Sequence, residues 1–352
     1  MQTEILHATA VTPKGSISDS YIRIDNGQIQ MVESWAGQFS GRDSRIIDAS
    51  GLVVSPGWID IQINGSFGKD FTEDPESIWE VAAQLPRFGT TSFLPTIVSA
   101  PLDTYKRAIQ VLQQGPPAGW FGSMPLGLHF EGPLLNPGKK GAHNPLHLRE
   151  PGLEFISGWS RANGVLLVTL APELPGALDL GKVLIERGIV VSAGHSLATI
   201  EQAEAAFEAG VRCGTHLYNA MPSLDHRTPG LTAALLIHDE ICASLIADGI
   251  HSHPEMVRLA WKCKGKNKLI LVTDAVSALG MPPGRYFLGG MITLLDNKSV
   301  RLSDGTLAGS IVTLEQELIN IVTFCGVDVA EVLPALSQNP CSSSGFEYQR
   351  PS

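Results

Sequence analysis

After Pro56-Gly57 the chain repeats one pattern, in which a short apolar run is followed by an amphipathic stretch. Apolar runs that alternate with helix-period stretches are typical of repeated βα units around a parallel sheet. Such a repeat predicts an α/β fold of the (β/α)8 type, a TIM-like barrel, and 352 residues exceed the roughly 250 that this barrel needs. Eight runs occur, over residues 58–63, 92–98, 125–130, 165–170, 189–193, 212–216, 242–247 and 268–273.

The residues on either side of this repeat follow other patterns. Residues 1–55 alternate apolar and polar positions around the turn Asp25-Asn26-Gly27, which predicts the strands of a small β domain. Residues 56–337 form the predicted barrel, and residues 338–352 lack periodicity, which predicts an irregular tail. The clearest helices are predicted over 198–210, 253–264 and 313–326, and a further one begins at 74–76.

Composition limits the class of partner. Hydrophobic residues make up 43% of the chain, enough to fill a large core. The 25 basic and 35 acidic residues give a net charge of −10 without a Lys/Arg stripe, which argues against nucleic acid. No run of about 18 apolar residues occurs, so we expect no membrane span. Five scattered cysteines and a first segment without a secretory signal predict a reduced, cytoplasmic protein.

Ionisable side chains stand at the ends of several predicted strands, where barrel enzymes place their active sites. Glu131, His195 and His216 form a candidate metal set, because one carboxylate and two imidazoles with an open position are a known zinc arrangement. Iron or manganese accepts similar donors, so the metal stays open. Each histidine taken alone could instead be a hydrogen-bonded core residue.

Asp274 follows the apolar run 269–272 after a single residue, Thr273. A carboxylate there could take a proton from a metal-activated water and later deliver it to a leaving amine. The alternatives are a structural cap or an additional metal ligand. Asp60 is not included in the site, because strand alternation can turn it toward the barrel wall, where it would hydrogen-bond the scaffold.

Two loops are candidates for anion recognition. The glycine-rich loop 134–144 follows the third predicted strand, and the segment 219–227 follows the sixth and ends in Arg227. Backbone N–H groups and arginine are the usual phosphate donors. Tight turns also need glycine, however, and Arg227 could equally be a solvated surface residue.

Seven motifs in this order and spacing give the chain a specific family resemblance. They are PGWIDIQINGSFGKDF, HFEGPLLNPGKKGAH, SAGHS, GTHLYNAMPSLDHRTPG, ADGIHSHPE, LVTDAVSALG and LAGS. The chain resembles the N-acetylglucosamine-6-phosphate deacetylases of the amidohydrolase superfamily. The resemblance implies hydrolysis of the acetamide of N-acetyl-D-glucosamine 6-phosphate to D-glucosamine 6-phosphate and acetate. Gln62 and Asn64 stand where two-metal members carry His-x-His, so the resemblance implies a single divalent ion, zinc before iron, manganese or cobalt.

The resemblance also implies roles for individual residues. Glu131, His195 and His216 match the metal ligands, Asp274 matches the general base and acid, and His143 matches a residue that polarises the acetyl carbonyl. The family is commonly homodimeric, and a residue of one subunit completes the phosphate site of the other. The positions that match sugar-phosphate contacts are Ala142, His143, Asn219, Ala220, Arg227, His251, and the backbone of Leu307, Ala308 and Gly309.

The chain departs from the family pattern at its C-terminal end. The family's usual C-terminal strands, which complete the small β domain, are expected to be missing, and the stretch 338–352 resembles nothing in the family. Two alternatives therefore stay open. One is an inactive or sugar-phosphate-binding truncated homologue. The other is a different amidohydrolase, such as a dihydroorotase-like or adenine-deaminase-like enzyme, although Gln62 and Asn64 count against the two-metal versions.

Overall fold

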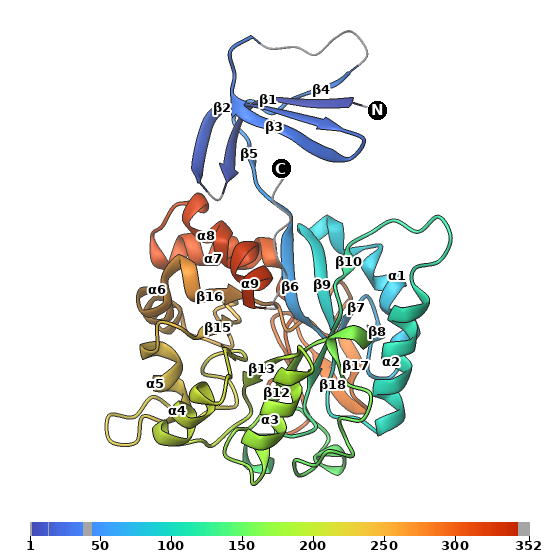
Figure 1. Ribbon diagram of the computed structural model, residues 1–352, viewed down its shortest axis with the longest axis vertical. Coiled ribbons are helices and arrows are strands. Elements are labelled where there is room, and N and C mark those ends of the chain that lie inside the picture. Colours follow the sequence, from blue (N-terminus) through green and yellow to red (C-terminus); the bar gives the residue numbers. More distant parts are fainter. Residues whose placement is uncertain (1, 13, 38–43, 344–352) are drawn as a thin grey trace.

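The computed structural model describes residues 2–12, 14–37 and 44–343. Its first five strands form one sheet in the order β3-β2-β1-β4, with β5 beside β1 (Figure 1). β1, β2 and β3 pair antiparallel, and the loop Asn26-Gly27 has φ angles of 50° and 77°, as a tight hairpin turn requires. β4 and β5 lie parallel to β1. The strands are β1 Gln2–Thr12, β2 Gly15–Asp25, β3 Gln28–Ser34, β4 Arg45–Asp48 and β5 Val53–Val54.

β5 leads from this sheet into the first strand of a nearly closed parallel barrel (Figure 1). Each predicted apolar run contains at least one barrel strand, so the predicted fold class is confirmed. The sixth strand is much shorter than predicted, because the backbone turns left-handed at His216, with φ 37°. The strands are β6 Trp58–Ile63, β9 Thr90–Ile97, β10 Met124–Pro125, β11 Leu128–Glu131, β12 Val165–Leu170, β13 Val190–Ala193, β14 Cys213–Gly214, β15 Cys242–Leu245 and β16 Leu269–Leu271.

The barrel closes through contacts between the first strand and the residues that follow the last. The Thr273 hydroxyl donates to Asp60 Oδ2 over 2.6 Å, and the Asp274 N–H donates to the Gln62 carbonyl over 2.9 Å. Asp60 is fully buried, and this burial raises its pKa to about 7. Asp60 therefore joins β6 to the segment after β16, which agrees with its exclusion from the candidate site.

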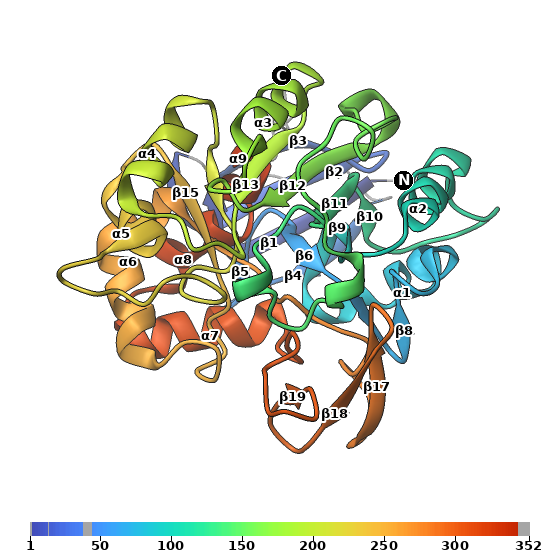
Figure 2. The same cartoon turned by 90° about the horizontal axis from the view of Figure 1, so that it is seen from below.

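Helices surround the strands (Figure 2), and no helix among the described residues is long and apolar enough to cross a membrane. The helix predicted at 74–76 begins as the 3-10 turn Pro75–Ser77 and continues as α1. The helices are α1 Ile78–Ala82, α2 Leu102–Gln114, α3 Ala177–Glu186, α4 Ile200–Glu208, α5 Gly230–Ile237, α6 Pro254–Lys268, α7 Leu314–Cys325 and α8 Val329–Leu336. Further 3-10 turns span Leu85–Phe88, Pro137–Lys139, Pro145–His147 and Arg161–Asn163.

Two small sheets interrupt the βα repeat. β7 (Gly65–Ser66) and β8 (Lys69–Asp70) form a short hairpin after β6. β17 (Gly284–Leu288), β18 (Met291–Leu295) and β19 (Val300–Arg301) form an antiparallel sheet after β16. This second sheet was not predicted, and its turn Gly289-Gly290 has φ angles of 53° and 79°. Its buried face, which includes Leu288 and Leu295, packs beside the cavity described below.

The segment after α8 differs from the irregular tail expected from residue 338. Gln338–Ser343 forms a further short helix, α9. The Asn339 side chain is buried and donates to the carbonyl groups of Lys266 and Leu269, at 2.8 and 2.7 Å. These bonds fix the start of α9 to the end of α6, an interaction that no periodic pattern reveals. The rest of the predicted tail, 344–352, lies outside the described residues.

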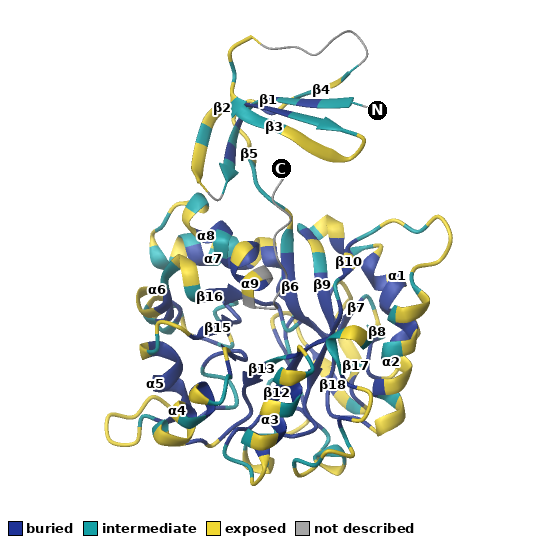
Figure 3. Ribbon diagram, in the orientation of Figure 1, coloured by how far each residue is buried: buried dark blue, intermediate teal, exposed yellow. Residues whose placement is uncertain are grey.

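The buried faces of the helices pack on the outside of the barrel strands (Figure 3). An aromatic cluster of Tyr105, Phe130 and Trp159 lies between α2 and β11, with ring centroids 4.7 to 5.2 Å apart. The Tyr105 hydroxyl accepts from the Ala100 N–H and donates to the Val98 carbonyl, at 3.2 and 3.4 Å. The cluster therefore anchors the segment that follows β9.

We expect Tyr105→Phe to destabilise the protein by about 1–2 kcal/mol, because it leaves two buried backbone groups without their partner. Chemical denaturation should show this as a lower midpoint with an unchanged slope. Tyr286→Phe is the matched control, since its hydroxyl bonds to the Pro282 carbonyl at an exposed site and should matter by less than about 0.5 kcal/mol. Equal effects of the two substitutions would contradict the assignment.

Candidate active site

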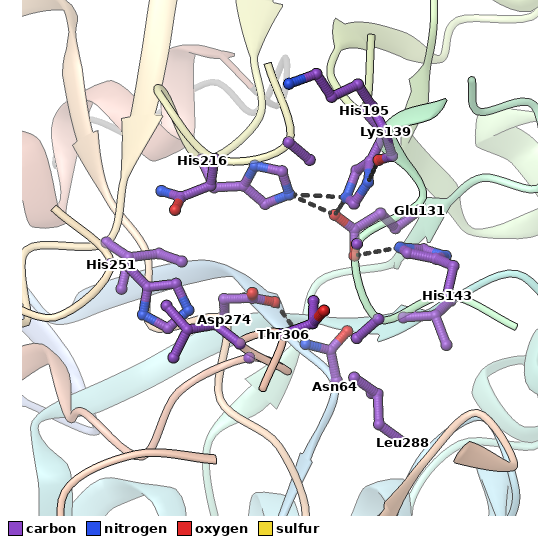
Figure 4. Close-up of a pocket in the computed structure, with 18 of the residues that line it drawn as sticks. Asn64, Glu131, Lys139, His143, His195, His216, His251, Asp274, Leu288 and Thr306 are labelled. Atoms are coloured by element: carbon purple, nitrogen blue, oxygen red, sulfur yellow. Dashed lines mark hydrogen bonds and ion pairs between the residues drawn. The ribbon is translucent and has the colours of Figure 1, made fainter. Parts of the chain in front are cut away.

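One cavity of about 320 Å³ opens at the carboxyl ends of the barrel strands (Figure 4). It collects side chains from seven separate loops, which is the arrangement expected of a barrel enzyme. Most of the residues predicted for the site line it together: Glu131, Ala142, His143, His195, His216, Asn219, Ala220, His251, Asp274, Leu307 and Gly309. Ala308 is buried beside this wall without lining the cavity.

Glu131, His195 and His216 converge at the floor of the cavity. Glu131 Oε1 lies 3.2 Å from His195 Nε2 and 2.9 Å from His216 Nε2, and the two imidazole nitrogens are 3.0 Å apart. One ligand atom from each of the three lies within 4.8 Å of the others, and all three residues are buried. The predicted metal set is thus brought together by three different strands, and it can hold an ion.

The protonation states of this cluster suit a cation. His195 Nδ1 lies 2.8 Å from the Lys139 carbonyl, which can only accept, so the ring turns its Nε2 lone pair toward Glu131. Burial lowers the pKa of His195 to about 4, which keeps this ring neutral. Burial alone would raise the pKa of Glu131, but the polar surroundings that His143, His195 and His216 provide outweigh burial and hold that pKa well below its usual value. A carboxylate and imidazole nitrogens are donor types that zinc takes.

Local backbone geometry turns these side chains inward. The φ angles of His195, His216 and Asp274 are 49°, 37° and 48°, in the left-handed region that residues other than glycine seldom adopt. Each residue lies two or three positions beyond the end of its strand, which is β13, β14 or β16. Such strained positions concentrate at functional sites, where the surrounding structure enforces them.

The amides of Gln62 and Asn64 face the carboxylates of the site. Gln62 Nε2 donates to Glu131 Oε1 at 2.9 Å and to Asp274 Oδ1 at 3.2 Å, and Asn64 Nδ2 donates to Asp274 Oδ1 at 2.6 Å. Amide donors therefore hold the carboxylates of Glu131 and Asp274 on the side where β6 ends.

Asp274 is suited to proton transfer. Its carboxylate is only partly buried and borders the cavity. Burial, followed by the nearby Glu131 carboxylate, raises the pKa of Asp274 to about 6. A group with this pKa can accept a proton near neutral pH and release it again.

His143 is held as a hydrogen-bond donor. Its Nδ1 accepts from the Ser99 N–H at 3.2 Å, and a backbone amide can only donate, so the proton of the neutral ring lies on Nε2. His143 Nε2 is 3.7 Å from Glu131 Oε2 and faces the cavity (Figure 4). His129, two residues before Glu131, instead bonds to Thr169 at 2.8 Å in the barrel interior. Its role there is structural.

The expected anion donors are only partly assembled. Arg227 is exposed on the loop after β14 and does not line the cavity. Its N–H and that of Thr228 donate to Asp225 Oδ1 in a local turn. Lys139 lies in the glycine-rich loop 134–144, was not among the predicted site residues, and does line the cavity. Its Nζ donates to the Met221 carbonyl at 2.7 Å, next to Asn219 and Ala220.

His251 lies at another wall of the cavity. Its Nδ1 bonds to Asp248 Oδ2 at 2.7 Å, and both side chains are more than nine-tenths buried. The aspartate fixes the ring, so His251 presents its other nitrogen to the cavity. This position agrees with the predicted contact to substrate.

Two curated relatives cover nearly the whole chain. N-acetylgalactosamine-6-phosphate deacetylase of Escherichia coli O157:H7 is 35% identical over 98% of this chain and 90% of its own length. N-acetylglucosamine-6-phosphate deacetylase of Lysinibacillus sphaericus is 34% identical over 95% and 87%. The similarity extends across both the N-terminal sheet and the barrel.

A solved structure shows the same fold. It is a variant of N-acetyl-D-glucosamine-6-phosphate deacetylase from Mycobacterium smegmatis in complex with N-acetyl-D-glucosamine 6-phosphate, 29% identical, with a TM-score of 0.88 over 98% of this chain and 90% of that one. The amidohydrolase family pattern matches residues 53–348. With the barrel, the cavity and these relatives in agreement, this chain belongs to the amidohydrolase family.

Proposed function

We propose that this protein hydrolyses the acetamide of N-acetyl-D-glucosamine 6-phosphate, releasing D-glucosamine 6-phosphate and acetate, in amino-sugar metabolism. One observation carries the proposal: Glu131, His195 and His216 converge in a single cavity with the carboxylate of Asp274 and the Nε2–H of His143. Relatives that span nearly the whole chain bear the name of this activity, which supports the choice of substrate.

Glu131, His195 and His216 are proposed to hold one divalent ion, zinc before iron, manganese or cobalt. Amidohydrolases are generally metal-dependent, and the buried cluster described above has the donor types that zinc takes. When bound, such an ion supplies Lewis acidity, which activates water and polarises a carbonyl group.

Asp274 and His143 are proposed to perform the proton chemistry. The Asp274 carboxylate accepts a proton from the attacking water, and its acid form then gives that proton to the amine nitrogen as the C–N bond breaks. His143 Nε2–H donates to the acetyl oxygen, where negative charge develops. The amides of Gln62 and Asn64 keep the Asp274 carboxylate in place throughout.

The pKa of Asp274 sets an expectation for the pH profile. The rate needs the carboxylate form, so kcat should fall as the pH drops through the pKa of about 6. A cation beside Asp274 lowers its pKa further, so the acid limb of the loaded enzyme should lie at or below this value. Measured kcat over a pH series tests this, and an acid limb centred well above that value would contradict the role of Asp274.

The sugar phosphate is proposed to contact Ala142, Asn219, Ala220, His251 and the 307–309 backbone, with Lys139 supplying positive charge. Lys139→Ala should raise KM for the phosphorylated substrate roughly tenfold or more, because a charge-assisted hydrogen bond contributes about 1.5–3 kcal/mol. Activity on unphosphorylated N-acetylglucosamine should change little. Lys140→Ala is the control, since its Nζ bonds to the Gly141 carbonyl and it does not line the cavity. A rise in KM for both sugars would reject the assignment.

We further propose a homodimer, in the cytoplasm, in which Arg227 from a second copy of the chain completes the phosphate site. Arg227 is exposed and lies away from the cavity of its own chain. The free cysteines Cys213, Cys242, Cys263 and Cys325 suit a reducing compartment. Gel filtration with activity measured across the peak tests the dimer, and a fully active monomer would contradict it.

The direct test of the proposed function is acetate release by the purified, zinc-loaded chain, with metal content measured on the same sample. Release that requires the 6-phosphate supports the proposal. The N-acetylgalactosamine-6-phosphate epimer should be assayed beside it, because one relative is named for that substrate. Preference for the epimer would reassign the sugar, and no release from either by folded, metal-loaded protein would favour an inactive or binding role.

A further inference from the structure

Glu173, on the loop after β12, does not line the cavity and has no part in the chemistry above. Its half-buried carboxylate nevertheless accepts three hydrogen bonds from two other loops. Oε1 accepts from Asn136 Nδ2 at 2.8 Å and from the Leu197 N–H at 2.5 Å, and Oε2 accepts from the Ser196 hydroxyl at 2.7 Å. Glu173 therefore joins the glycine-rich loop after β11 to the segment after β13.

Both of these loops hold His195. Ser196 and Leu197 directly follow it in the chain. From the other loop, the Asn136 N–H donates to the His195 carbonyl at 3.0 Å. Asn136 also caps the turn Pro137–Lys139 through Gly138, and the Lys139 carbonyl at the end of that turn bonds to His195 Nδ1 at 2.8 Å. The hydrogen bonds to the His195 carbonyl and to its Nδ1 thus both come from a segment tied to Glu173.

His195 depends on such support. Its φ of 49° lies in the left-handed region, so its backbone conformation must be imposed by neighbours. Its Nε2 must also stay 3.2 Å from Glu131 Oε1, a residue of another strand. Without an acceptor at position 173, the Asn136 amide and the Leu197 N–H lose a partner, and both loops can move to find another.

We propose that Glu173 is a positioning residue that sets the affinity of the candidate metal site through His195. The inference rests on the proposed function, because it assumes that Glu131, His195 and His216 bind an ion. Groups that orient a metal ligand typically change metal affinity by roughly 10–100-fold when removed. Glu173 acts through hydrogen-bond acceptance, so a carboxamide of the same shape can replace its carboxylate.

The test compares Zn²⁺ affinity, by competition with a chromogenic chelator, in wild type, Glu173→Ala and Glu173→Gln. Glu173→Ala should weaken Zn²⁺ binding at least tenfold and lower kcat, with KM nearly unchanged. Glu173→Gln should stay within about threefold of wild type, because its amide oxygen can accept from Asn136 and Leu197 and its NH2 can donate to Ser196. Glu186→Ala is the matched control, since Glu186 is exposed on α3 of the same βα unit.

A double-substitution cycle distinguishes a specific loss of Zn²⁺ affinity from a general folding defect in one variant. Asn136→Ala should weaken Zn²⁺ binding in the same direction, and Asn136→Ala combined with Glu173→Ala should be no weaker than Glu173→Ala alone. Wild-type Zn²⁺ affinity in Glu173→Ala, equal loss in the Gln and Ala variants, or additive losses in the cycle would each overturn the inference. Absence of Zn²⁺ binding by the wild-type chain would instead contradict the proposed function.

Discussion

Replacing Asp274 by Asn should lower kcat for acetate release by about a thousandfold, within the range of 10²–10⁴ expected for loss of a general acid–base group. The carboxamide keeps the size of the side chain but can neither accept the proton of the attacking water nor carry one to the amine. Zinc content should not fall, because the Asp274 carboxylate accepts hydrogen bonds from Gln62 and Asn64 and is not part of the Glu131, His195 and His216 cluster. Steady-state kinetics and metal analysis on the same preparation measure both quantities.

The matched control is Asp103→Asn, in which the same exchange is made at a side chain that is 87% exposed on α2. It should leave kcat within about twofold of wild type. If Asp274→Asn kept more than about a tenth of the wild-type rate at full metal occupancy, Asp274 would not be the general base and acid.

Glu131→Gln should abolish stable zinc binding and with it the hydrolytic activity, by roughly a thousandfold or more if the ion supplies the Lewis acid. Glu131 contributes the negative charge of the cluster and contacts both His195 and His216. A carboxamide is a weaker donor for zinc, and its NH2 group would oppose the cation. Inductively coupled plasma analysis after dialysis should give about one zinc per wild-type chain and much less for the variant.

Glu154→Gln provides the control for this exchange, because Glu154 is exposed on the loop that follows the same strand. Its zinc content and activity should match wild type. Full zinc occupancy in Glu131→Gln would show that the ion is held elsewhere and would remove the basis of the proposed mechanism.

The barrel and the centre of the candidate site could be predicted from the sequence because both follow from local rules. Apolar runs identify strands that are buried on both faces, and the residue after each run must lie at the carboxyl end of the sheet. Glu131, His195, His216 and Asp274 all lie at the end of such a run or within two residues of it, so the fold class predicts that they converge. Donor chemistry at these positions predicts the metal set and the proton transfer by Asp274, and the family resemblance adds the role of His143.

The rest of the site depends on contacts between loops. Such contacts leave no periodic pattern of apolar and polar residues in the sequence. β17 and β18 were missed because they are short and half exposed, although Gly289-Gly290 is a hairpin signal. Lys139 and Glu173 were missed because their importance lies in contacts with Met221, Asn136 and Leu197, which are distant in the chain. The tail expected from residue 338 begins instead as α9, which is held by contacts of Asn339 to α6.

The left-handed strand ends at His195, His216 and Asp274 have a consequence for how this protein can evolve. Each position costs conformational free energy of order 1–3 kcal/mol. Selection for catalysis maintains these residues in spite of that cost. Asparagine tolerates this backbone region better than histidine, and glycine tolerates it best. In a duplicated gene released from selection for catalysis, replacement of these residues by glycine would relieve that conformational cost. The active-site residues should decay before the barrel does, so folded but inactive descendants are an accessible outcome for this lineage.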